Sequence, residues 1–381
     1  MRSMSVATFG WKASAASPSN KLLQAWKDVN MNHNENKSKK TLKIDCPPFI
    51  NTALTIKGCT ISNRLLLAPM AGLGHIAFRE LVAEFGGYGL LFTGMCSAKA
   101  VPQENPAVSQ VFKWRTQELP RLVCQIFGPD PLSMARAAQR IEKEGFFGVD
   151  LNFGCSVSAI CKKGSGAILL KSPDLAVDIV KAVRQAVGIP VFVKFRTGWE
   201  NNVTPAVDIA RRFEDAGADA LVFHPRIAPD RRSRPPLWEH ITQVKKGVSI
   251  PVFGNGNLFE WSDCEKMFEQ TRCDGFSIGR MAVARPWLFA QWSQGFIPDE
   301  QTGFNAAIRL TQLLLKYHDE RTAVKLFKKY VPYFAAGFKF GHAICKEVLK
   351  GDEITEIQDI IATLAAKKPE TTLRPNLHLF S

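Results

Sequence analysis

Short apolar runs alternate with segments of helical period between about residues 50 and 290. Each apolar run is bounded by glycine or proline, and its length is typical of a buried strand. Amphipathic segments that can form helices lie between the runs, at residues 77–84, 131–143, 174–186, 207–215 and 261–269. The apolar runs cover residues 65–68, 89–93, 122–127, 148–151, 190–195, 220–224, 251–254 and 275–279.

Eight strand–helix units in about 240 residues predict a (β/α)8 TIM barrel. A doubly wound open sheet is the rival fold, and for dinucleotide binding it would need an early G-x-G-x-x-G turn. The nearest sequence, Gly164-Ser165-Gly166, comes in mid-chain and lacks the third glycine. We therefore favour the barrel.

The alternation stops after Phe296, and the following segments of helical period predict a separate all-α domain of about 80 residues. We divide the chain into a disordered N-terminal extension (1–46), a catalytic barrel (47–296) and a helical domain (297–381). The helical segments cover residues 306–316, 322–338, 343–350 and 354–367.

A formal net charge of +14 and a pI near 9.4 favour polyanionic partners such as nucleic acid. Within the helical domain, residues 321–350 form a basic stretch that holds seven bases and one acid, Glu347. We expect the aromatic residues between those bases to pack in the core, and the bases to form a surface that contacts phosphates. The candidate contacts are Lys325, Lys328 and Lys329.

The cysteines, the apolar runs and the N-terminal composition bear on metal binding and on cellular location. The nine cysteines include no C-x-x-C pair and no zinc-type spacing, so we expect free thiols, no metal site and a reducing compartment such as the cytoplasm. The sequence contains no run of about 18 apolar residues, so it predicts no membrane span. Residues 1–27 contain bases but no acid, a composition also permitted for an organellar targeting segment. We prefer a disordered extension, and we expect a monomer.

The ends of the predicted strands carry polar or glycine-rich groups, and in a barrel these ends meet at one mouth. The turns after the last two strands, Gly254 to Asn257 and Gly279-Arg280, have glycines that let backbone N–H groups approach a phosphate. Lys194 follows apolar neighbours, so its ammonium needs an anionic or electron-rich partner such as the pyrimidine edge of a flavin. The remaining strand ends hold Pro69-Met70-Ala71-Gly72, Thr93-Gly94-Met95, Gln125, Asn152 to Cys155, and His224-Pro225-Arg226.

Cys155 follows Asn152-Phe153-Gly154 at the end of the fourth predicted strand. A thiol is mostly protonated at neutral pH and can donate a proton to a developing carbanion. A buried packing cysteine is the alternative. Its position at a strand end leads us to choose the chemical role.

Together these residues resemble the tRNA-dihydrouridine synthase family over roughly residues 65–288. The segments that carry the likeness are L-A-P-M-A-G (67–72), D-L-N-F-G-C-S with the later C-K-K-G-S-G-A-I-L-L (150–170), V-K-F-R-T-G-W (193–199), G-N-G-N (254–257) and D-G-F-S-I-G-R (274–280).

The resemblance implies an FMN-containing barrel and a helical tRNA-binding domain. It implies that NADPH reduces FMN, that N5 of the flavin gives hydride to C6 of a uridine, and that Cys155 protonates C5. Asn152 would touch the uracil, while Lys163 and Arg196 would face the substrate. FMN would be held by Pro69, Met70, Gln125, Lys194, His224, Asn255, Gly256, Asn257, Gly279 and Arg280.

Several positions depart from the family pattern. Ser156 stands where proline usually follows the cysteine, and Asn257 replaces the aspartate of an N-G-D turn. The familiar H-G-R-T becomes His224-Pro225-Arg226-Ile227, and Pro225 removes a backbone donor. Alternatives therefore stay open: an FMN barrel acting on free dihydropyrimidines, a synthase acting on ribosomal RNA, or a non-catalytic RNA-binding barrel.

Overall fold

The computed structural model describes residues 48–228 and 234–380. The extension predicted at 1–46, with any targeting role, lies outside the described residues. Within them, no helix is long and apolar enough to cross a membrane.

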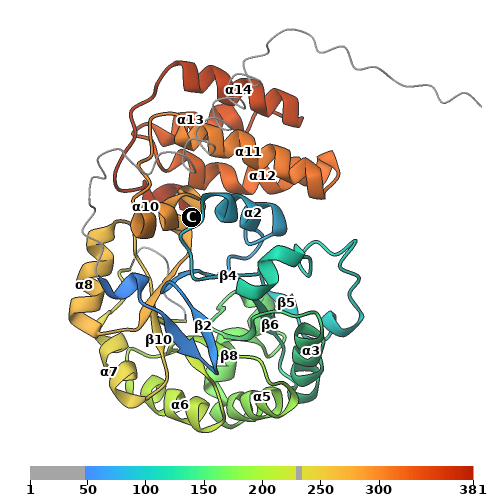
Figure 1. The fold of residues 1–381 in the computed structure, drawn as a ribbon, viewed down its shortest axis with the longest axis vertical. Coiled ribbons are helices and arrows are strands. Elements are labelled where there is room, and N and C mark those ends of the chain that lie inside the picture. The colour runs from blue at the N-terminus through green and yellow to red at the C-terminus, as the bar shows by residue number, and fades with distance from the viewer. Residues whose placement is uncertain (1–47, 229–233, 381) are drawn as a thin grey trace, which may run out of the picture.

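A closed parallel barrel forms the larger part of the structure (Figure 1). Each strand pairs with its neighbours in parallel register, and the β3–β4 and β4–β6 pairings close the ring. A short additional strand, β5 (Cys96–Ser97), extends beside β6. The barrel strands are β3 (Leu65–Leu67), β4 (Leu90–Phe92), β6 (Leu122–Phe127), β7 (Gly148–Phe153), β8 (Val191–Gly198), β9 (Ala220–Ile227), β10 (Val252–Asn255) and β11 (Gly275–Ile278).

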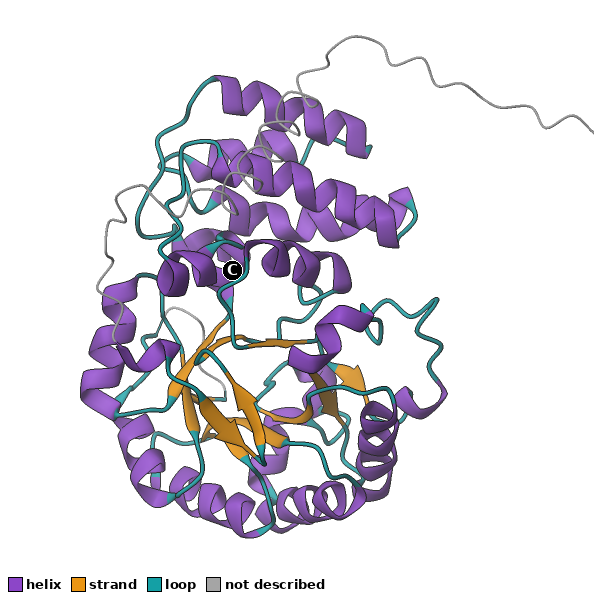
Figure 2. Cartoon of the chain, viewed as in Figure 1, coloured by secondary structure: helices purple, strands orange, loops and turns teal. Residues whose placement is uncertain are grey.

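Helices surround the barrel, so that the strands lie inside a ring of helices (Figure 2). Their apolar stripes pack on the outward-facing side chains of the strands, as in other parallel sheets. These helices are α2 (Ile76–Phe85), α3 (Pro131–Lys143), α5 (Pro173–Ala186), α6 (Thr204–Asp215), α7 (Glu239–Gly247) and α8 (Trp261–Thr271), with shorter α4 (Ser158–Cys161), α9 (Arg280–Ala284) and α10 (Leu288–Gln294).

The barrel interior is apolar at its N-terminal end. Leu66, Phe92, Val123 and Phe192 form a buried layer there, to which β9 and β10 add Ala220, Val222 and Phe253. An antiparallel hairpin of β1 (Leu54–Ile56) and β2 (Cys59–Ile61) contributes Ile56 and Ile61 to this layer. The hairpin therefore covers the bottom of the barrel with apolar side chains, and the opposite end is left for polar groups.

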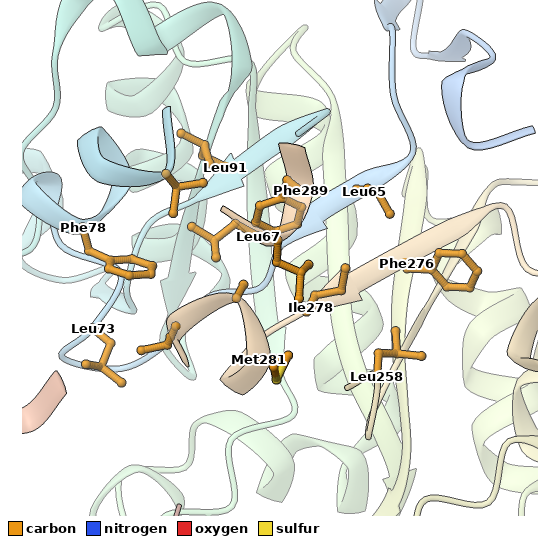
Figure 3. Packing of buried hydrophobic residues seen from close by; sticks show 14 of the residues in the cluster. Leu65, Leu67, Leu73, Phe78, Leu91, Leu258, Phe276, Ile278, Met281 and Phe289 are labelled. Atoms are coloured by element: carbon orange, nitrogen blue, oxygen red, sulfur yellow. The ribbon is translucent and has the colours of Figure 1, made fainter. Parts of the chain in front are cut away.

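The C-terminal helices stack beside the barrel, next to α2 and α10 (Figure 1). One apolar cluster runs from the barrel wall into them, and Figure 3 shows Leu67, Ile278, Met281 and Phe289 within it. Ion pairs at the α2 surface add to the packing, for example between Arg309 and Glu84. The helices are α11 (Thr302–Tyr317), α12 (Glu320–Ala335), α13 (Gly341–Val348) and α14 (Ile354–Ala366).

The predicted fold class is confirmed, and each predicted strand overlaps a barrel strand. The helix predicted at 322–338 ends earlier, at Ala335, because Phe338 bridges to Thr371 and the Lys339 N–H donates to the Glu370 carbonyl. The hairpin β1–β2 and helices α4, α7, α9 and α10 were not predicted.

Candidate active site

A polar layer lies one step above the apolar layer of the barrel. Side chains alternate in a strand, so Gln125 follows Val123 inside β6 and Lys194 follows Phe192 inside β8. His224 follows Val222 in the same way on β9. The C-terminal half of the barrel therefore holds amides, charges and an imidazole.

A chain of hydrogen bonds connects β6 and β7 within this layer. Gln125 Nε2 donates to Asp150 Oδ2 at 2.6 Å, and Asn152 Nδ2 donates to Gln125 Oε1 at 2.8 Å. Asn152 Oδ1 then accepts the backbone N–H groups of Gly154 (3.1 Å) and Cys155 (2.9 Å). The turn that carries Cys155 is thus bonded to the interior of the barrel.

A buried pair of opposite charges, Asp150 and Lys194, lies in the polar layer. Burial raises the pKa of Asp150 to about 7, and the Gln125 hydrogen bond and Lys194 act against that rise. Burial also lowers the pKa of Lys194 to about 8, while Asp150 and Cys155 oppose the fall. Each group thus opposes the effect of burial on the other, and an anion bound nearby would further stabilise the charged form of the lysine.

His224 is neutral in this environment. Burial, together with the positive charge of Lys194 and of nearby arginines, lowers the pKa of His224 well below its ordinary value. A neutral imidazole can both donate and accept a hydrogen bond.

The turn after β10 gathers two guanidinium groups. Asn257 Oδ1 accepts from Arg226 Nη2 at 3.0 Å and from Arg280 Nη2 at 2.9 Å. Asn257 has a positive φ of 55°, a conformation that asparagine tolerates well. A Cβ on Gly256 would lie 3.1 Å from Cδ2 of His224, so glycine keeps the turn close to β9. This corner suits an anion such as a phosphate.

Other predicted residues lie around the same mouth. Met70 is in contact range of Gly279, where an added Cβ would lie 3.0 Å from its Sδ, and Pro69 precedes it. Asn255 Nδ2 donates to the Ser277 carbonyl at 2.6 Å. Arg196 lies opposite His224 in the β8–β9 register. These residues border the C-terminal end of the barrel.

The Cys155 turn folds onto the segment that follows it. The Cys155 carbonyl accepts from the Ala167 N–H at 2.8 Å and from Cys161 Sγ at 3.5 Å. Gly166 has a φ of 71°, and a Cβ there would collide with the Cys155 carbonyl oxygen. Cys155 itself is half-buried, whereas Lys163 is exposed on the turn after α4.

The predicted phosphate-contacting lysines do not behave alike. Lys325 and Lys329 are exposed, while Lys328 pairs with Asp352 at 2.8 Å. Lys329 reaches the barrel mouth, where it lies against Gly72. Phe327, Tyr330, Phe334 and Phe338 are buried, as expected of core aromatics; Phe340 is 74% exposed, against that expectation.

Two site residues were missed by the sequence reasoning. Asp150 is fully buried, and its signal was a carboxylate within an otherwise apolar strand. Arg226, which is 5% exposed, was noted at a strand end without being given a role. The described residues contain no group of three or more His, Cys, Asp or Glu placed to hold a metal.

This closed barrel, with a cationic and amide-lined mouth at the C-terminal ends of its strands, defines a TIM-barrel protein with a site suited to an anionic ligand. The fold is similar to the old yellow enzyme from Trypanosoma cruzi (TM-score 0.51, 12% identity, covering 71% of this chain and 98% of that one). It is also similar to histamine dehydrogenase from Rhizobium sp. 4-9 (TM-score 0.51, 13% identity, 72% and 52% covered).

The chain belongs to the dihydrouridine synthase (Dus) family, whose model matches residues 66–339. It is 33% identical over 284 residues to tRNA-dihydrouridine synthase B of Pseudomonas aeruginosa, covering 73% of this chain and 85% of that protein. It is 31% identical over 315 residues to the probable tRNA-dihydrouridine synthase 1 of Synechocystis sp., covering 81% and 88%. The predicted family is thereby confirmed.

Proposed function

We propose that this chain is a tRNA-dihydrouridine synthase, which reduces the C5=C6 bond of uridines in tRNA with FMN as cofactor and NADPH as reductant. The observation that carries the proposal is the hydrogen bond from the Cys155 N–H to Asn152 Oδ1, 2.9 Å long, at a barrel mouth lined by Lys194 and His224. A thiol fixed at that place can serve as the acid that the reduction needs.

The residues present fit a flavin. The phosphate would be held by the corner of Gly256, Asn257 and Arg280, with Asn255 and Gly279 beside it. The buried ammonium of Lys194 suits the pyrimidine edge, which gains negative charge on reduction. When bound, the flavin supplies the hydride. The remaining cofactor contacts that we assign are Pro69, Met70, Gln125 and His224.

Cys155 completes the reduction. Addition of hydride at C6 places negative charge on C5 and its neighbouring carbonyl, so an acid must stand next to C5. The thiol of Cys155 gives up its proton there, and the C5–H bond forms as the S–H bond breaks. Asn152, whose amide is already held by Gln125, would contact the uracil edge.

Substrate binding would combine the barrel mouth with the helical domain. Lys163 and Arg196 would face the RNA at the mouth, and Lys325, Lys328 and Lys329 would contact phosphates. The uridine must leave its stack to reach the mouth, which costs a few kcal/mol. A basic stretch of the helical domain, residues 321–350, that binds the folded RNA offsets this cost.

Several finer assignments belong to the same proposal. They are the domain division at 46/47 and 296/297, NADPH as the reductant, a monomeric state and a cytoplasmic location. The location is supported by the bacterial relatives that the chain resembles.

The test is a map of dihydrouridine in total RNA from cells with and without the gene. We expect loss of the base from defined tRNA positions, and purified protein that is yellow and bleached by NADPH. If dihydrouridine is lost from ribosomal RNA alone, the substrate is ribosomal RNA and not tRNA. Reduction of free pyrimidines without RNA would favour the dihydropyrimidine alternative, and a colourless protein would contradict an enzymatic role.

A further inference from the structure

Asp150 occupies an unusual place for a carboxylate. Its side chain is fully buried in β7, beneath the mouth, and Oδ1 has no hydrogen-bond partner among the described residues. Burying a carboxylate is costly unless it is paired and hydrogen-bonded, and here the charge of Lys194 and the Gln125 amide offset part of that cost. The proposed roles of Cys155, Lys194 and Gln125 give no task to it.

The hydrogen bonds of Asp150 impose an order on two amides. The charge of Lys194 and the hydrogen bond from Gln125 favour the ionised form of Asp150 against its burial. An ionised carboxylate can only accept, so Gln125 turns its Nε2 towards Asp150, at 2.6 Å. The Oε1 of Gln125 then faces Asn152 and accepts from Nδ2 at 2.8 Å. Asn152 is left with Oδ1 directed at the backbone of the Cys155 turn. Rotation of either amide by 180° would place donor against donor or acceptor against acceptor.

We propose that Asp150 is a positioning residue, which fixes the Gln125 and Asn152 amides in one orientation and thereby holds the turn that carries Cys155. The proposal deepens the function proposed above and rests on it for the role of Cys155. Without Asp150, the Gln125 amide loses the acceptor that selects its orientation. Asn152 then spends part of its time with Nδ2 facing the N–H groups of the turn. The turn loses its hydrogen bonds to Oδ1, and the Cys155 side chain becomes more mobile.

The experiment is a double-mutant cycle read out on the Cys155 thiol. The rate of alkylation of Cys155 by iodoacetamide is followed by peptide mass spectrometry in the wild type, Asp150→Ala, Asn152→Ala and the double variant. We expect each single variant to raise the rate at least about threefold, and the double variant to equal Asn152→Ala. An unchanged rate in Asp150→Ala, or additive effects in the double variant, would overturn the proposal.

Three further variants make the result specific. Asp150→Asn offers Gln125 a donor as well as an acceptor at nearly unchanged volume, so it no longer selects one amide orientation and should raise the rate as Asp150→Ala does. Asp219→Ala removes a carboxylate at the other end of the barrel, which accepts from Arg184 and the Val191 N–H, and should leave the rate unchanged. If Asp150→Ala fails to fold, Asp150→Leu fills the same space and replaces it in the cycle.

Activity gives a separate readout. On tRNA, Asp150→Ala should lower kcat because the acid is displaced, and should also raise KM because the Asn152 amide that we assign to the uracil edge loses its fixed orientation. If the wild type forms no dihydrouridine at all, the proposed function fails, whereas the alkylation cycle still decides the role of Asp150.

Discussion

Lys329 of α12 extends to the loop after β3, where a Cβ added to Gly72 would lie 3.1 Å from its Nζ. Gly72 has a φ of 71°, so the loop turns sharply at this point and leaves room for the ammonium. A base of the helical domain thus stands at the rim of the barrel mouth. Lys329 therefore brings one positive charge from the helical domain to the mouth.

Replacing lysines on α12 should weaken tRNA binding in a graded way. We expect the reduction in affinity to be greatest for Lys329→Ala, smaller for Lys325→Ala and least for Lys328→Ala, because Lys328 is already paired with Asp352. Removing one lysine–phosphate interaction should reduce the slope of log K against log salt by about 0.7–0.9. The measurement is tRNA binding between low and moderate salt.

Control substitutions for that series lie on the outer helices. Lys143 on α3 and Lys181 on α5 are also exposed, and their replacement by alanine should leave both affinity and salt slope unaltered. Equal reductions for all five lysines would indicate a diffuse charge effect, and the surface on α12 would then have no special part.

Cys155→Ala should separate cofactor binding from turnover. We expect normal flavin content and bleaching by NADPH, with dihydrouridine formation reduced about 10²- to 10⁴-fold through loss of the acid. Cys161→Ser is the matched control, since Cys161 bonds to the carbonyl of the same turn and should retain most activity. Full activity in Cys155→Ala would remove the thiol from the mechanism.

Much of this fold could be predicted because its strands are buried on both faces. Continuous apolar runs such as 122–127 and 190–195 are seen directly in the sequence. The hairpin β1–β2 could not be found in the same way, because each strand has three residues and one of them, Ile56 or Ile61, supplies the buried contact. Its stability comes from the barrel floor that it covers, which is a tertiary effect.

The site was predictable to the extent that its residues stand at strand ends. Lys194 and His224 stand at the ends of predicted strands, and in the structure both follow apolar interior residues, Phe192 and Val222, by two positions. Asp150 was missed because a buried acid is disfavoured on average, and its partner Gln125 comes from another strand. The pairing of Lys328 with Asp352 could not be predicted from the sequence either, because 24 residues separate them.

One bidentate ion pair should add modestly to the apolar packing of the helical domain on the barrel. Arg309 of α11 donates to Glu84 of α2 through Nη2 at 2.7 Å and Nε at 3.1 Å, and both side chains are about one-fifth exposed. Arg309→Met should cost about 1 kcal/mol in the free energy of unfolding and weaken tRNA binding. Combining it with Glu84→Gln should add little, as a denaturant series would measure.

A surface pair of similar exposure provides the comparison. Arg140 and Glu144 are bonded at 2.6 Å within α3, away from the helical domain. Arg140→Met should cost a similar or smaller amount of stability without changing tRNA affinity. If both arginine variants bind tRNA equally well, the Arg309–Glu84 pair contributes stability alone.

Asp150 and Lys194 should change the free energy of unfolding of the flavin-free protein in opposite directions as the pH rises. The pKa of Asp150 is raised by burial to about 7, so its contribution to stability is present below pH 4 and is lost as the pH rises to about 7. The pKa of Lys194 is lowered by burial to about 8, so stability is lost as the pH falls from about 10 to about 8. Denaturant unfolding at several pH values measures the free energy of unfolding over both pH ranges.

Two variants assign these changes to their residues. Asp150→Asn should remove the fall in the free energy of unfolding between pH 4 and 7, and Lys194→Met should remove its change above pH 8. A fall between pH 4 and 7 that persists in Asp150→Asn would assign it to another carboxylate.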